Sequence, residues 1–154
     1  MGKFEITDAD ASGIVIKRKS DISKAGVPGP AEVTRAHSRL AILPNPNDAT
    51  LSGGDKYVQS PWPVVPAVPV NPNTWEDAEL AVVNLNDLSG TDPFLKRKNV
   101  GKHIDAMAQA LSDYRSYALV VEVDGSMIII DGHHRLMAAW LLGQETAPVW
   151  KVEL

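Results

Sequence analysis

The residues best suited to chemistry are five consecutive ones, Asp131, Gly132, His133, His134 and Arg135, which we call the 131–135 box. An apolar run precedes the box and a helix-like pattern follows it. Glycine lets the backbone turn sharply and approach a ligand, and the first N–H groups of a helix have no acceptor within the helix. These groups and the helix dipole attract anions. The box therefore predicts a phosphate site at a helix start.

The side chains of the box suggest roles in that site. The planar fork of Arg135 can donate two parallel hydrogen bonds to a phosphate. His133 or His134 could add a donor, or act as general acid or base near neutral pH. Asp131 could accept from a histidine, cap the helix, or hold Mg²⁺ or another divalent cation beside bound phosphates. The simpler alternative is that Asp131 is only a helix cap and Arg135 only half of a surface ion pair.

Zinc is not favoured as a ligand of the box. Neighbouring side chains on a helix point about 100° apart, so His133 and His134 are poorly placed to share one ion. The sequence therefore indicates no particular metal for the box.

A second basic group comes earlier in the chain, on a helix predicted over residues 96–114. Lys98 and Lys102 lie four residues apart and share a face of that helix, so both could reach the same phosphates as the box. The alternative is a solvated helix start.

The elements that must position the box are the ones that the sequence predicts most clearly. Asp124 and Gly125 separate two apolar, β-branched runs at residues 117–123 and 126–130, which predicts a hairpin with a type I′ turn. A helix at 133–142 should end at Gly143, and a last strand should follow at 148–152. Upstream, residues 80–85 read as a strand and residues 86–93 as a loop.

The first half of the chain divides into two predicted parts. Residues 1–43 form a weakly structured segment with a short strand at 13–17 and a helix at 31–40. Residues 44–75 form an extended arm, because each proline removes a backbone donor and fixes φ. The prolines are Pro44, Pro46, Pro61, Pro63, Pro66, Pro69 and Pro72. The arm is apolar as well, so it should lie on a surface, either that of its own domain or that of a partner.

Composition bounds the function. The formal net charge of −4 argues against a protein that coats nucleic acid, although a local basic site is compatible with it. The chain has no cysteine, which excludes disulfides, thiolate zinc sites and cysteine nucleophiles. No apolar run has the roughly 20 residues that a membrane span needs, so we expect no membrane association. An address in the cytoplasm, or inside an assembled virus particle, fits best.

The box and its surroundings resemble the ParB/sulfiredoxin-like superfamily. The strand 128–130, the box, the paired Ala138 and Ala139, Gly143 and the Pro148–Val149 strand follow that order, and the resemblance covers about residues 80–153. It implies an α+β fold, a small mixed sheet with helices, over residues 76–154, with the Pro-rich arm in front. It also implies a nucleotide such as ATP or CTP, or another phosphate ligand, at the box.

Departures from the family narrow the function. Sulfiredoxins carry a reactive cysteine where this chain has His133, so sulfinic acid repair is excluded. Partition proteins continue into DNA-binding domains, which we do not expect after Leu154. The leading hypothesis is a stand-alone ParB-like domain that binds nucleotide or nucleic-acid phosphate and is a candidate metal-dependent nuclease or NTPase. The alternative is a non-enzymatic assembly protein, for example of a bacteriophage virion, whose arm binds neighbouring subunits or a protein partner. A small toxin or immunity-type effector is a third reading.

Overall fold

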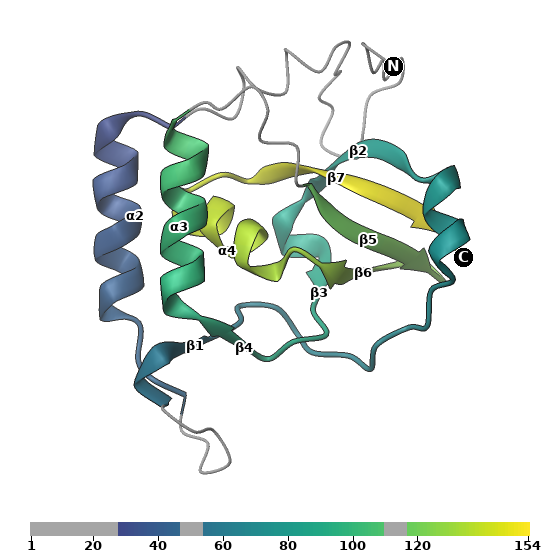
Figure 1. The fold of residues 1–154 in the computed structure, drawn as a ribbon, viewed down its shortest axis with the longest axis horizontal. Helices are drawn as coiled ribbons and strands as arrows, with labels where there is room; N and C mark the ends of the chain where they lie inside the picture. The colour runs from purple at the N-terminus through teal and green to yellow at the C-terminus, as the bar shows by residue number, and fades with distance from the viewer. Residues whose placement is uncertain (1–27, 47–53, 110–116) are drawn as a thin grey trace.

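The structure is a computed structural model, and it describes residues 28–46, 54–109 and 117–154. Its helices are α2 (Pro30–Ile42), α3 (Arg97–Ala108) and α4 (His133–Leu141), with short 3-10 helices η1 (Gly54–Lys56), η2 (Pro72–Asp77) and η3 (Leu85–Asp87). Its strands are β1 (Tyr57–Gln59), β2 (Glu79–Asn84), β3 (Leu88–Ser89), β4 (Phe94–Lys96), β5 (Ala118–Val123), β6 (Ser126–Asp131) and β7 (Thr146–Glu153). The predicted α+β class is confirmed (Figure 1).

The main sheet has the strand order β2-β7-β5-β6-β3 and is mixed. β5 and β6 form the predicted antiparallel hairpin, and Asp124 and Gly125 have φ values of 50° and 82°, as a type I′ turn requires. β7 returns through α4 to pair parallel with β5 and antiparallel with β2. The hairpin thus delivers the end of β6 directly into the start of α4.

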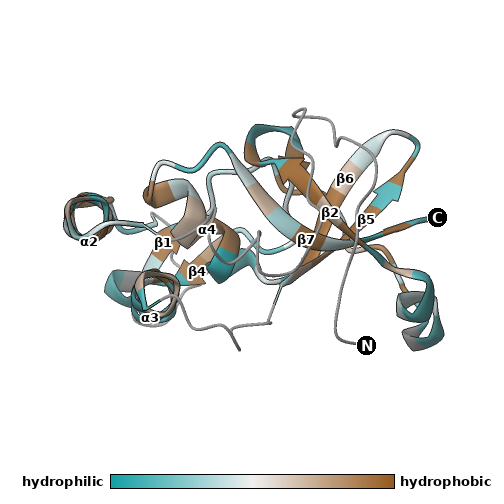
Figure 2. Ribbon diagram, turned by 90° about the horizontal axis from the view of Figure 1, so that it is seen from above, coloured by the Kyte–Doolittle hydropathy of each residue, from teal (hydrophilic) through white to brown (hydrophobic). Residues whose placement is uncertain are grey.

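The helices cover one face of this sheet (Figures 1 and 2). α4 lies next to the strands, α3 packs on α4, and α2 packs outside α3. Their apolar residues join inward-facing strand residues in one core, for example Ala36, Ile104 and Leu136 with Val120 and Ile129. Most residues of α4 are buried in this packing, which fixes the position of the start of the helix.

The other face of the sheet is covered by the Pro-rich arm. Alternation along the hairpin turns Val121 and Ile128 to this face, and Val65, Val68 and Val70 of the arm pack on them. We call residues 60–71 the strap. The strap is held at its start by buried Trp62, whose indole N–H donates to the carbonyl of Leu85 at 2.7 Å. In the described chain, the inner side of the strap therefore lies on its own domain (Figure 1).

The strap is also hydrogen-bonded to the loop between β3 and β4, which contacts His133 of the box. The N–H of Val65 donates to the carbonyl of Gly90, and the N–H of Gly90 donates to the carbonyl of Pro63, at 2.8 and 2.7 Å. This contact is a parallel bridge between Val64 and Gly90. The strap is thus extended, as its prolines predict, whereas other parts of the arm expected at 44–75 are not a plain extended linker: residues 54–59 form η1 and β1, and residues 72–75 belong to η2.

The helix expected at 31–40 is α2, the strands expected at 80–85 and 148–152 are β2 and β7, and the helix expected at 133–142 is α4. Gly143 has a φ of 83° and follows the end of α4, as predicted. The strand expected at 13–17 lies outside the described residues, as does the end of the helix expected at 96–114. The division into an N-terminal segment at 1–43, an arm at 44–75 and a domain at 76–154 stays a prediction.

Candidate functional site

The start of α4 has a backbone that only glycine fits well. Gly132 is the N-cap, with φ 97° and ψ 21°. A Cβ atom at this position would lie 2.7 Å from both Cα and Cβ of Ala118 on β5. The N-cap residue, being glycine, contributes no side-chain cap to α4, and the first turn carries no acidic residue. The usual side-chain cap at the N-cap position is therefore missing from α4, as at a helix start that binds an anion.

Both histidines of the box accept hydrogen bonds from backbone N–H groups of an earlier segment. Nε2 of His133 accepts from the N–H groups of Thr91 and Asp92, at 3.0 and 3.3 Å. Nε2 of His134 accepts from the N–H of Lys96 at 3.0 Å. A ring nitrogen that accepts carries no proton, so each imidazole is neutral with its proton on Nδ1. The histidines thus fasten residues 91–96 to the start of α4.

The protein environment keeps these rings neutral. Burial lowers the pKa of His133 and of His134, and it outweighs the carboxylates of Asp92 and Asp131, which act to raise both. The positive charge of Lys96 lowers the pKa of His134 further. The site is therefore built around neutral imidazoles near neutral pH.

Arg135 is a buried residue of α4 that lies near α3. Its side chain is 8% exposed, and its guanidinium carbon lies 5.0 Å from the centre of the Tyr117 ring. Together with burial, the charge of Arg135 lowers the pKa of His103 on α3. Tyr117 and His103 therefore form part of this environment. His103 was visible in the sequence only as one more residue after Lys102, and nothing in the pattern paired it with Arg135.

Asp131 has a local role in the structure. Its carboxylate Oδ1 accepts from the N–H of Gly132 at 2.9 Å, and the side chain is exposed. This bond precedes the helix and is not a cap of α4. Among the described residues, no group of three or more His, Cys, Asp or Glu side chains gathers as a metal cage.

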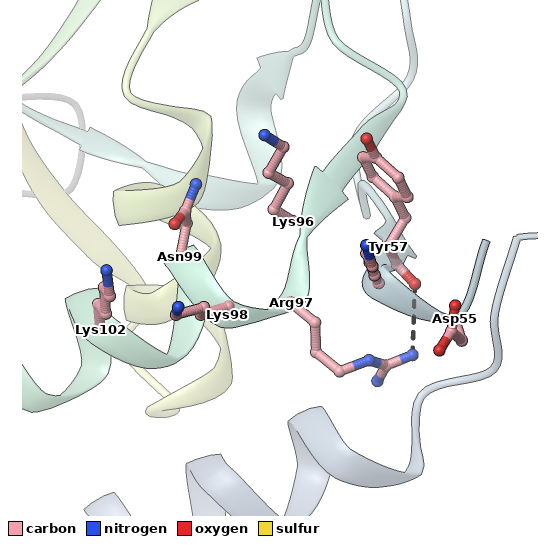
Figure 3. Close-up of a pocket in the computed structure, with 8 residues that line it drawn as sticks. Asp55, Tyr57, Lys96, Arg97, Lys98, Asn99 and Lys102 are labelled. Carbon is pink, nitrogen blue, oxygen red and sulfur yellow. Dashed lines mark hydrogen bonds between the residues drawn. The ribbon is translucent and has the colours of Figure 1, made fainter. Parts of the chain in front are cut away.

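A second feature adjoins the box at the start of α3 (Figure 3). It is a hollow of about 950 Å³, which we call the basic hollow. Its cationic lining is Lys56, Lys96, Arg97, Lys98 and Lys102, and its other lining residues are Asp55, Tyr57 and Asn99. The two lysines predicted from the sequence, Lys98 and Lys102, thus lie in one wall. The residues of the box do not line this hollow, and the two features meet where Lys96 donates to His134.

Arg97 holds the hollow together without an opposite charge in the described chain. Its guanidinium donates to the carbonyls of Leu40, Leu43 and Tyr57 and to Oδ1 of Asn45, at distances from 2.6 to 3.3 Å. Figure 3 shows the side chain turned toward α2, away from Lys96. Arg97 thereby ties α2, α3 and β1 together.

The lysines of the hollow are likewise without carboxylate partners within the described residues, where the salt bridges are His37–Asp105 and Lys151–Glu122. Basic residues at a helix N-terminus oppose the helix dipole. Lys98 and the α3 start therefore present net positive charge that a bound anion would neutralise.

Comparison of the chain with protein-family models, with curated proteins and with solved structures gives no match. Separately, none of the helices in the described ranges has the length and apolar character needed to cross a bilayer.

Proposed function

We propose that this chain is a ParB/sulfiredoxin-like domain that binds a phosphate group of a nucleotide or nucleic acid at the start of α4. The observation that carries the proposal is the geometry of Gly132, which opens α4 without a side-chain cap at the N-cap position and leaves no room for a side chain. The basic hollow next to it supplies Lys98 and Lys102, as the sequence suggested. The resemblance in sequence and the geometry of the site thus favour the same kind of ligand.

The tautomer of the histidines favours binding over hydrolysis. Because Nε2 of His133 and of His134 already accepts from the backbone, the nitrogen left to meet a ligand is Nδ1, which carries a proton. That nitrogen is a donor, the role that a phosphate oxygen needs. A general base would need an unprotonated nitrogen facing the substrate. A nuclease or NTPase activity remains a second proposal, with Asp131 as the carboxylate left for other chemistry.

In this proposal, a divalent cation would bind only when the phosphate ligand is also bound. The exposed carboxylate of Asp131 is the box residue that would hold Mg²⁺, which proteins often bind through one or two carboxylates plus substrate phosphates. Such an ion would neutralise phosphate charge. ATP and CTP are the nucleotides to test first. The protein would meet its ligand in the cytoplasm or within a virus particle.

The alternative of a non-enzymatic assembly protein rests on the strap. Its inner residues are packed on the sheet of this chain, while Val64 is 50% exposed. A partner or a second copy would therefore have to use the outer side of the strap.

The test is calorimetric titration of the folded protein with ATP and CTP, with and without Mg²⁺. Arg135→Ala should abolish binding, and Arg135→Lys should weaken it, since lysine keeps the charge and loses the fork. Arg35→Ala, an exposed change on α2 with the same loss of charge, is the control and should bind like the wild type. Because Arg135 is buried, the folding of each variant is checked by urea unfolding. Nucleotide binding that is unchanged in folded Arg135→Ala, or absent in the wild type, would refute the proposal.

A further inference from the structure

The two-stranded ribbon of β1 and β4 has one inner and one outer face. Its register pairs Val58 with Leu95, and both are fully buried, so this pair faces the core. The pairs on either side, Tyr57 with Lys96 and Gln59 with Phe94, must therefore face outward. Figure 3 shows Tyr57 and Lys96 side by side at the edge of the basic hollow.

This outer face places two aromatic rings beside positive charge. Tyr57 and Phe94 are both partly exposed, and neither belongs to an apolar core cluster of the described residues. As diagonal neighbours on an antiparallel pair, they are separated by about 7–8 Å, within reach of one extended ligand. Lys96 is exposed on the same face, directly opposite Tyr57 and two residues along β4 from Phe94.

The charge continues from the ribbon into the hollow. Lys56, Lys98 and Lys102 are exposed, and together with Lys96 they outnumber the single carboxylate of the lining, Asp55. This concentration of positive charge is local, because the chain as a whole has a net charge of −4. A cluster of that kind attracts an anion along its length rather than at one point.

We infer that the ribbon and the basic hollow form a binding surface for single-stranded nucleic acid. Unpaired bases would stack on Tyr57 and Phe94, and the backbone phosphates would run past Lys96 into the hollow toward Lys98 and Lys102. Rings interleaved with lysines are what sequence-tolerant binding of a single strand uses. In a duplex the base faces are already stacked on one another, so these rings would have nothing to bind.

The inference rests on the proposed function in one respect. It names single-stranded nucleic acid as the ligand, and one phosphate of that ligand would reach the box near the contact between Lys96 and His134. Its own residues lie outside the box. Tyr57 and Lys56 also lie outside the part of the chain that resembles the ParB/sulfiredoxin-like superfamily, so this wall of the surface is not implied by that resemblance.

The experiment measures fluorescence anisotropy of labelled oligo(dT), oligo(U) and duplex DNA of about 15 nucleotides with the full chain. The wild type should bind the single strands more tightly than the duplex. Tyr57→Ala should weaken binding by roughly 5-fold to 140-fold, the range of one lost stacking contact. Tyr57→Phe keeps the ring and should bind within about 2-fold of the wild type, because stacking needs only the π-face.

Further variants separate the rings from the charges. Phe94→Leu retains an apolar side chain and loses the π-face, so it should weaken binding even if Phe94→Ala does not fold. Lys96→Ala leaves the backbone N–H to His134 in place and should reduce the slope of log K against log salt by about 0.7. Arg35→Ala is the charge-matched control and should leave the slope unchanged.

The outcomes distinguish the two proposals. Equal affinity for duplex and single strand, or wild-type affinity in folded Tyr57→Ala and Phe94→Leu, would overturn the inference. If ATP or CTP binding survives and no oligonucleotide binds, this inference fails and the proposed function stands. If oligonucleotides bind and depend on the rings while Arg135→Ala changes nothing, the surface is supported and the proposed phosphate site at the box fails.

Discussion

Replacing Gly132 with alanine tests the geometry on which the proposed phosphate site depends. The position combines two separate constraints, a φ of 97° and a neighbouring backbone that is too close for a Cβ atom. An alanine would meet Cα and Cβ of Ala118 at 2.7 Å, so α4 and β5 would have to move apart. Because β5 is a central strand of the sheet, that movement would disturb the core.

The two constraints can be given separate magnitudes. Alanine in a left-handed conformation costs about 1–2 kcal/mol. Overpacking at a rigid contact adds about 1–3 kcal/mol, which brings the expected loss of stability to about 2–5 kcal/mol. Gly143 is the matched control, since its φ is 83° and a Cβ there would have nothing within 4 Å. Gly143→Ala should therefore show only the conformational cost.

The assay is urea unfolding of the wild type and the two variants, followed by tryptophan fluorescence. We expect Gly132→Ala to lower the free energy of unfolding by about 1–3 kcal/mol more than Gly143→Ala does. Equal losses in the two variants would mean that β5 and α4 are not in contact as described. The close contact that explains why α4 begins at a glycine would then be wrong.

Two more predictions concern the elements around the site. Burial lowers the pKa of His133 below its usual 6.5, so the unfolded chain takes up a proton first as the pH falls below that value. The contribution of His133 to stability should thus be fully present above pH 6.5 and decline on acidification. His133→Gln should flatten this decline, measured as the midpoint of urea unfolding at each pH. A midpoint that does not change with pH in this range would contradict the buried neutral ring. Trp62→Phe, which removes the hydrogen bond to Leu85, should cost about 1 kcal/mol, whereas Trp62→Ala should cost about 3–5 kcal/mol. Wild-type stability of Trp62→Ala in urea unfolding would show that the strap is not fastened to the domain.

The elements that sequence reasoning predicted are those specified by neighbouring residues. The hairpin follows from Asp124-Gly125 between two apolar runs, and the end of α4 follows from Gly143, because both depend on local backbone conformation. The partners of the histidines could not be predicted in this way. Thr91 and Asp92 lie about forty residues before His133 and offer only backbone N–H groups, which every residue but proline has. No residue type marks such a contact.

The same limit applies to the outer face of the ribbon, and it bears on how the site should be understood. In the sequence, Tyr57 lies in a Pro-rich arm and Lys96 in a basic run before a helix, and neither pattern points to the other. Only the register of β1 with β4 brings them onto one face. The box, by contrast, is contiguous, so its residues attract a chemical interpretation before their contacts are known. Because the histidine Nε2 atoms accept from the backbone, the rings position the segment that carries Lys96, and the role that we propose for their other nitrogen is donation to a phosphate rather than removal of a proton. The hydrogen bond from the N–H of Lys96 to His134 joins the ribbon to the box, so loss of that histidine should disturb both of the proposed ligand sites.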